Sequence, residues 1–267
     1  MTRTLYWTTR WLPQGLFDAL RQLTVFAGAY YAYRIVRGFV DGRTTVAFSH
    51  ARSLVDLERG MGLFFEPSLQ HWALANPWIV DITNWAYVNT HFVVTTTFLV
   101  WLYLARNSAF YFVRNMFVIA MGLALVGYVV FPAAPPRLFP ELGFTDTVTQ
   151  AVGQSQANTA KLLFNPYAAM PSMHVGFALM VAIPAFKLIA TRPLRLFWAV
   201  YPAFVTFVVV VTANHFWIDG AFGALVAGIS AYGATALGRL RPDAWAWRRP
   251  DPAAEPPEAG LGAEAPA

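Results

Sequence analysis

The chain has 267 residues, of which 57% are hydrophobic and only 12% are charged. A soluble domain usually carries about 25% charged residues, so the composition is that of a membrane protein and excludes an ordinary soluble fold. The absence of cysteine excludes disulfides, thiolate catalysis and zinc–thiolate sites. The net charge of +5 is scattered between apolar runs, which favours contact with membrane lipids and predicts no nucleic-acid partner.

Apolar runs of helical length follow one another along the chain. A transmembrane helix needs about 20 mostly apolar residues, and six runs come near this length. Arg21, Arg34 and Arg37 interrupt the first run, and the other five are cleaner. We therefore predict an all-α polytopic integral membrane protein with about six transmembrane helices. The predicted spans are Leu16–Phe39, Trp78–Leu104, Ala109–Phe131, Met173–Ala190, Leu194–Val211 and Trp217–Leu237.

The segment 44–74, after the first span, is too charged to cross a membrane. Leu54, Leu57 and Met61 recur in it at helical spacing, and charged residues such as Glu58 stand between them. This pattern predicts an amphipathic helical segment that lies at the membrane interface or caps the bundle.

The six spans predict one membrane catalytic domain over residues 1–240. A polar loop rich in Pro, Gly, Gln and Asn occupies residues 132–170, between the third and fourth spans. Residues 241–267 are rich in Pro, Ala and Glu, and we predict that they form a disordered tail.

Six spans place both termini on the same side of the membrane. Most arginines fall on that side, whereas the two later loops on the other side carry only Arg137 and Lys161. The positive-inside rule makes the arginine-rich side cytoplasmic. We therefore expect a multi-pass protein of the cell membrane, with cytoplasmic termini and loop 132–170 on the extracytoplasmic face. The arginines of the cytoplasmic side are Arg3, Arg10, Arg106, Arg114, Arg192, Arg195, Arg239, Arg241, Arg248 and Arg249.

A polar island, Thr212–Gly220, precedes the last span. Its His215 and Asp219 are four residues apart and so share one face of a helix. A carboxylate there can accept one imidazole N–H and leave the other ring nitrogen free as a nucleophile. On spacing alone, a pair that merely satisfies two polar groups is as good an explanation. An Asp at the start of a membrane helix, however, is a functional hypothesis by default.

A second polar island, Asn165–His174, precedes the fourth span. Pro171 suits the first turn of a helix because it has no amide hydrogen to leave unpaired. Ser172, Met173 and His174 would then present free backbone N–H groups, which bind anions at a helix start. The Ser172 hydroxyl can add a donor and His174 can offer a proton to a departing oxygen. A purely structural helix cap explains this island, taken alone, equally well.

Together the two islands resemble the second and third motifs of the type 2 phosphatidic acid phosphatase superfamily, which also contains vanadium haloperoxidases. The family motifs are Pro-Ser-Gly-His and a terminal His-x-x-x-Asp, matched here by Pro171–His174 and His215–Asp219. The resemblance implies a six-helix core with an extracytoplasmic site, no metal or cofactor, and a phosphohistidine intermediate. It implies that His215 is the nucleophile, that Asp219 orients it and that His174 is the general acid. Ser172 would help to bind the phosphoryl oxygens.

The first family motif, Lys-x6-Arg-Pro, is only partly present. Arg137 supplies its arginine for phosphate binding, but Val130 stands at the lysine position. The Ser-Arg that opens the third motif is Val208-Val209 here. The stretches Pro132–Arg137 and Thr212–His215 look like the inositol phosphorylceramide synthase-like branch, whose members also depart from the first motif.

The same branch tends to carry polar residues on an earlier span, here Tyr87, Asn89 and His91. A lone histidine inside a span is more often a packing residue than a catalyst. Because of the resemblance to that branch, we nevertheless keep Tyr87 and His91 as possible residues of the site lining.

The sequence thus predicts a membrane enzyme that transfers or hydrolyses the phosphoryl group of a lipid phosphate. Water as acceptor makes it a lipid phosphatase. An alcohol such as inositol makes it a headgroup transferase like inositol phosphorylceramide synthase. A noncatalytic membrane carrier that retains the motifs is the alternative from another class.

Overall fold

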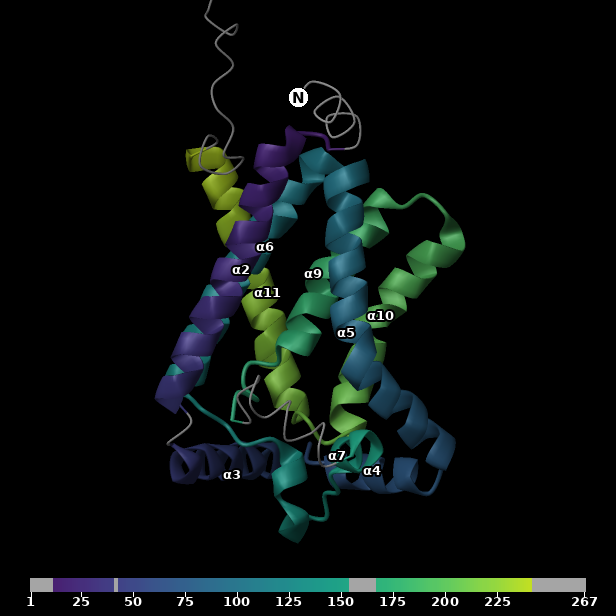
Figure 1. The fold of residues 1–267 in the computed structure, drawn as a ribbon. Coiled ribbons are helices and arrows are strands. Elements are labelled where there is room, and N and C mark those ends of the chain that lie inside the picture. The colour runs from purple at the N-terminus through teal and green to yellow at the C-terminus, as the bar shows by residue number, and fades with distance from the viewer. Residues whose placement is uncertain (1–11, 41–42, 154–166, 242–267) are drawn as a thin grey trace, which may run out of the picture.

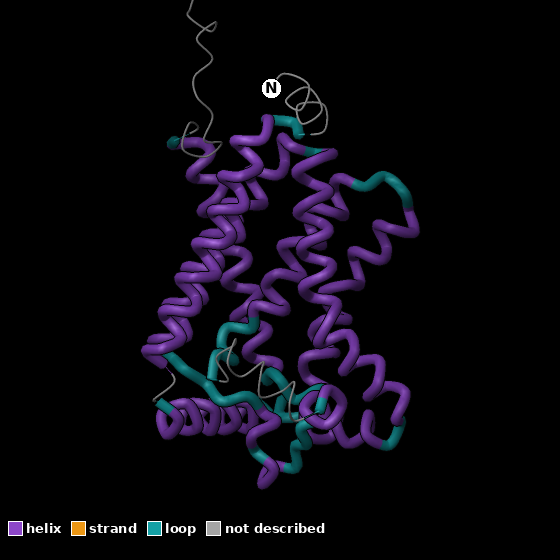
Figure 2. The backbone as a smooth tube through the Cα atoms, in the orientation of Figure 1, coloured by secondary structure: helices purple, strands orange, loops and turns teal. Residues whose placement is uncertain are grey.

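The computed structural model describes residues 12–40, 43–153 and 167–241. Within these ranges the chain forms helices and no strand, apart from one isolated parallel bridge between Ala133 and Ala168 (Figure 2). The predicted all-α fold is confirmed. Tail residues 242–267, the loop residue Lys161 and the first two residues of the Asn165–His174 island lie outside the described ranges.

Long helices run side by side and form a bundle, and shorter helices lie across one end of it (Figure 1). The bundle helices are α2 (Gly15–Val40), α5 (Pro77–Ala105), α6 (Asn107–Val130), α9 (Met173–Leu188), α10 (Arg192–Val211) and α11 (Trp217–Leu240). The end layer contains α3 (Thr44–Gly60), α4 (Glu66–Leu74), α7 (Thr147–Val152) and the 3₁₀ turns η1 (Pro136–Leu138) and η2 (Pro140–Leu142).

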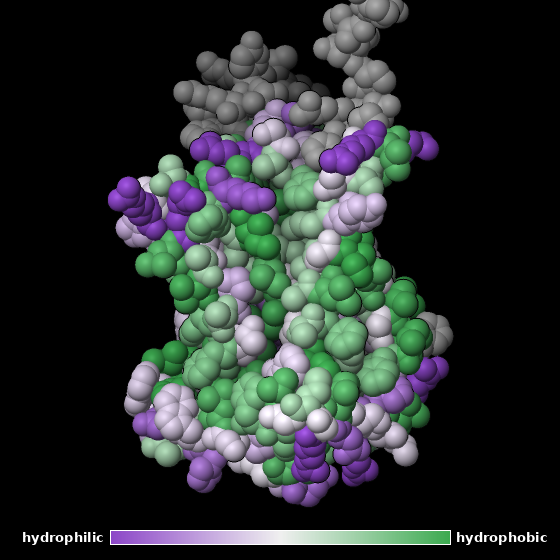
Figure 3. Space-filling model, turned by 180° about the vertical axis from the view of Figure 1, so that it is seen from behind, coloured by the Kyte–Doolittle hydropathy of each residue, from purple (hydrophilic) through white to green (hydrophobic). Residues whose placement is uncertain are grey.

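Four of the described helices, α5, α6, α10 and α11, are long and apolar enough to cross a membrane. Helix α9 is apolar but has only 16 residues, about 24 Å of helix against a hydrocarbon core of about 30 Å. The number of about six spans therefore remains a prediction. On the face shown in Figure 3, apolar side chains dominate the middle of the molecule and hydrophilic ones gather towards both ends. The protein is a polytopic membrane protein.

Helix α9 lies at the centre of the bundle and packs against both α10 and α11, while α11 also packs along α6. Two glycines bring the backbones of α9 and α11 into direct contact. A Cβ added to Gly223 would lie 2.1 Å from the carbonyl oxygen of Ser172, and one added to Gly176 would lie 3.0 Å from the carbonyl oxygen of Gly223. A side chain at position 223 would therefore clash with the backbone at the start of α9, and one at position 176 would be tightly packed.

The predicted amphipathic segment 44–74 forms two helices, α3 and α4. Gly62, just after the end of α3, has a φ of +70°, which is not a helical conformation. The predicted apolar stripe is partly wrong. Leu54 is buried, but Leu57 and Met61 are exposed. Glu58, expected among the polar residues between them, is instead fully buried, because its carboxylate accepts a backbone N–H from the distant helix α11.

Arg114, which we expected at the cytoplasmic surface, is also fully buried. Its guanidinium donates hydrogen bonds to the side chains of Asn115 and Gln22. Gln22 in turn donates to Asp18, which also accepts from Tyr103. These contacts satisfy the buried charges and link α2 to α5 and α6.

Candidate active site

The two polar islands of the sequence, Asn165–His174 and Thr212–Gly220, are about 40 residues apart in the chain. In the structure they meet where α9 and α11 begin, at the end of the bundle nearest to the end layer. The backbone N–H of Ser172 donates to the carbonyl oxygen of Asp219 over 2.9 Å. This bond lies next to the close crossing of α9 and α11 at Gly223. The start of α9 and the start of α11 are therefore held in a fixed relation, and so are the side chains that they carry.

His215 and Asp219 face one another, but not from one face of a helix as predicted, because α11 begins at Trp217 and His215 lies in the loop before its N-cap. His215 Nδ1 lies 3.5 Å from Asp219 Oδ2, and both side chains are buried. The same carboxylate oxygen accepts the backbone N–H of Phe216 over 2.9 Å. Asp219 therefore caps its own helix while it stands beside the imidazole. The separation is longer than a normal hydrogen bond, as is common at sites without bound substrate.

The second histidine completes a converging arrangement. His215 Nε2 lies 3.3 Å from His174 Nδ1. If the Nδ1 proton of His215 points to Asp219, its Nε2 carries the free lone pair. The proton between the two rings then belongs to His174. In this tautomer His215 Nε2 is the nitrogen with the nucleophilic lone pair, and that lone pair faces the His174 N–H.

Ser172 is the N-cap of α9, and its environment corrects part of the prediction. Pro171 precedes the N-cap and is not in the first helical turn, which begins at Met173. The Ser172 N–H is not free for an anion, because Asp219 accepts it. The Ser172 hydroxyl, by contrast, is buried and has no hydrogen-bond partner within the described part of the chain. It is thus available to an incoming group.

Arg137 is held against the His215 island. Its backbone N–H donates to the carbonyl oxygen of Ala213, and its guanidinium donates to the side chain of Asn214. Asp146 lies 3.8 Å from its Nε. The side chain remains 21% exposed, so it can still meet a ligand. The structure therefore places this cation against the residue that precedes His215.

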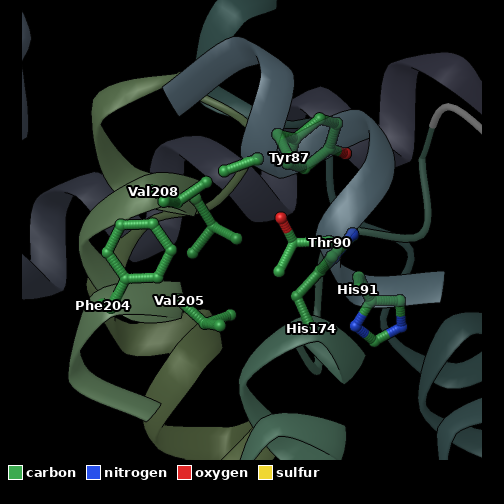
Figure 4. Close-up of a pocket in the computed structure, with 9 residues that line it drawn as sticks. Tyr87, Thr90, His91, His174, Phe204, Val205 and Val208 are labelled. Atoms are coloured by element: carbon green, nitrogen blue, oxygen red, sulfur yellow. The ribbon is translucent and has the colours of Figure 1, made fainter. Parts of the chain in front are cut away.

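Tyr87 and His91 of α5 both lie against His174. The ring centroids are 4.9 Å apart for Tyr87 and 4.5 Å apart for His91. A small cavity opens beside them, between α5 and the α10 side chains Phe204 and Val208 (Figure 4). Its volume is about 10 Å³, room for about one water molecule.

Val208 and Val209, which replace the Ser-Arg of the family's third motif, also line this cavity. Where the family motif has Ser-Arg, this protein therefore has two apolar side chains that line the cavity together with His174. Within the described residues, no group of three or more His, Asp or Glu side chains is arranged to hold a metal ion.

Two residues at this site were missed by sequence reasoning. Glu66 Oε1 accepts the backbone N–H of Trp217 over 3.1 Å, and Glu58 Oε1 accepts that of Ile218 over 3.4 Å. Both carboxylates are fully buried. Burial raises the pKa of Glu58 to about 9, and the neighbouring charge of Glu66 adds to the shift. Their partners are more than 150 residues away, so no local pattern indicates them.

The described residues thus form an all-helical membrane protein in which two histidines and an aspartate converge at two helix starts. The family model of the PAP2 superfamily matches residues 52–233, which is more than half of the chain. The chain therefore belongs to the PAP2 superfamily, whose members are in general phosphatases and phosphotransferases. No curated protein and no solved structure matches the chain.

Proposed function

We propose that the protein is a metal-independent phosphatase or phosphotransferase that acts on a lipid phosphate through a phosphohistidine on His215. The observation that carries the proposal is the convergence of His215 Nε2, His174 Nδ1 and Asp219 Oδ2 at the contact between α9 and α11. Membership of the PAP2 superfamily supports the reaction class. Placement at the ends of apolar helices supports a substrate that is itself part of the membrane.

Each side chain has a separate role in the proposed reaction. His215 Nε2 attacks phosphorus in line, and Asp219 stabilises the positive charge that develops on the ring. The incoming phosphate dianion supplies the charge that stabilises protonated His174, which then donates its proton to the departing alcohol. A water molecule or a second alcohol attacks the phosphohistidine, and His174 takes up the proton of that acceptor.

The phosphoryl oxygens need positive charge or hydrogen-bond donors, since this stabilisation usually contributes more to catalysis than any other single effect. Arg137 and the unpaired Ser172 hydroxyl are the donors that we propose for this task. The cavity beside His174 holds only about 10 Å³. A phosphoryl group is larger than this cavity, so the side chains around it must move before such a group can bind beside His174.

Within the superfamily, we propose the inositol phosphorylceramide synthase-like branch. The resemblance of Pro132–Arg137 and Thr212–His215 to that branch supports this assignment. The proposed topology has cytoplasmic termini and an extracytoplasmic site, on the strength of the arginine distribution. If water accepts the phosphoryl group from His215 the protein is a lipid phosphatase, and if an alcohol accepts it the protein is a headgroup transferase.

The test uses purified protein in detergent, with a chelator present and a panel of lipid phosphates offered with and without inositol. Free phosphate and new phospholipid are followed together, and His215→Ala is the control. Phosphate release that requires His215 supports the phosphatase. New phospholipid without free phosphate supports the transferase. No turnover of any lipid phosphate, with or without inositol, would contradict the enzyme and favour the noncatalytic carrier instead.

A further inference from the structure

The first turn of α11, which carries Asp219, is held by carboxylates from three different helices. The first N–H groups of any helix have no partner within the helix. Here Asp219 itself accepts the N–H of Phe216, Glu66 of α4 accepts that of Trp217, and Glu58 of α3 accepts that of Ile218. All three carboxylates are fully buried. Three successive amides that begin one residue after His215 are thus each bound by a carboxylate.

Burying carboxylates at this position has a high energetic cost, because a buried charge must be paired or neutralised. Glu58 Oε2 and Glu66 Oε2 are both buried without a hydrogen-bond partner within the described part of the chain. A proton on Glu58, whose pKa burial raises to about 9, would let its carboxyl group donate to the neighbouring Glu66. The positive end of the α11 dipole stabilises negative charge at this place.

We propose that Glu58 and Glu66 are positioning residues for the His215–Asp219 pair. The inference rests on the proposed function of that pair. Neither glutamate lines the cavity beside His174, and the backbone N–H groups that they accept belong to the first turn of α11. They act through α11, because the first turn of this helix sets where Asp219 Oδ2 stands relative to His215 Nδ1. The end-layer helices α3 and α4 are then a clamp on the catalytic helix.

The test compares Glu66→Ala with Glu66→Gln. A glutamine at position 66 keeps an oxygen that accepts the Trp217 N–H and gains an N–H₂ group that can donate to Glu58. An alanine removes the acceptor. The matched control is Glu141→Ala, which removes an exposed carboxylate of the same end layer, 3.6 Å from Arg52. The measurements are kcat and KM for the lipid phosphate, and amide hydrogen exchange of a peptide that contains residues 216–219.

We expect Glu66→Ala to speed exchange at Trp217 and to lower kcat by about 100-fold, with KM within about twofold of wild type. Glu66→Gln should restore both exchange and kcat, and Glu141→Ala should change neither. A residue with only a general effect on stability would lower the amount of folded protein and leave kcat per folded molecule unchanged. That result, or exchange at residues 216–219 that does not change in Glu66→Ala, would overturn the proposal. If wild-type turnover does not depend on His215, the proposed function fails, and the exchange measurement still decides whether the clamp exists.

Discussion

The contact between α9 and α11 offers the sharpest perturbation of the site, because a single methyl group can separate the two helices. In Gly223→Ala, the new Cβ would lie 2.1 Å from the Ser172 carbonyl oxygen and 3.2 Å from the Gly176 nitrogen. Carbon–oxygen contacts between packed backbones are about 3.3–3.6 Å. All of the atoms concerned are backbone, so no side chain can rotate away and the helices must move apart by about 1 Å.

This separation acts directly on the chemistry. It breaks the 2.9 Å bond from Ser172 N–H to the Asp219 carbonyl oxygen and moves His174 away from His215. A misplacement of about 1 Å can cost about 100-fold in rate, so we expect kcat to fall by about that factor. Overpacking should also lower the free energy of unfolding by about 1–3 kcal/mol, which is partly offset by the better helix propensity of alanine.

Gly228→Ala is the matched control, because it adds the same methyl group to the same helix. A Cβ at Gly228 meets no atom within 4 Å, so only the gain in helix propensity remains, about 1 kcal/mol or less. The assay is the His215-dependent release of phosphate, read together with the melting temperature in detergent. A Gly223→Ala protein with wild-type kcat and melting temperature would refute the argument that this crossing positions the site.

Two other substitutions test separate parts of the account. Arg137→Ala should lower kcat/KM by about 100- to 1,000-fold with Arg137→Lys recovering part of it, whereas Arg52→Ala, which removes an exposed arginine of the end layer, should leave the kinetics unchanged. For Glu58, burial raises the pKa from 4.5 to about 9, so the folded protein holds a proton that the unfolded chain has released. Its contribution to stability is complete below pH 4.5 and is lost as the pH rises towards 9, at up to about 1.4 kcal/mol per pH unit. The charges of Glu66 and Asp219 also act on the carboxyl group of Glu58, and both residues are still present in the Glu58→Gln variant. That variant should therefore show a flatter fall in melting temperature between pH 5 and about 9, and a slope equal to that of wild type would contradict the buried, protonated state.

The sequence predicted the bundle well because apolar runs and helix signals are local. Helix α11 begins at the predicted residue, Trp217, and α9 begins at Met173 as predicted. The four-residue spacing of His215 and Asp219 predicted one shared helical face, which is wrong, because His215 precedes the N-cap Phe216 of α11. Their proximity to His174 could be expected only from the family resemblance, because the two islands are about 40 residues apart and no periodicity links them.

The errors about buried polar groups concern contacts that sequence patterns do not show. Glu58 reads as part of a polar face, yet it is buried because it accepts an N–H from Ile218. Arg114 reads as a surface charge, yet Gln22 and Asn115 bind its guanidinium inside the bundle. Ser172 reads as a free helix-start amide, yet the Asp219 carbonyl oxygen accepts its proton. A buried polar group is recognisable only from its partner, and in these cases most partners lie far away in the sequence.

The central claim is that the phosphoryl group is carried by His215, and the most direct measurement is to trap that intermediate. The protein would be mixed with a lipid phosphate labelled on phosphorus, quenched in base within the first turnover, digested and analysed by peptide mass spectrometry. The account predicts an acid-labile phosphate on His215 of wild type and none in His215→Ala. Turnover in wild type with no labelled His215, or turnover that persists in His215→Ala, would contradict it.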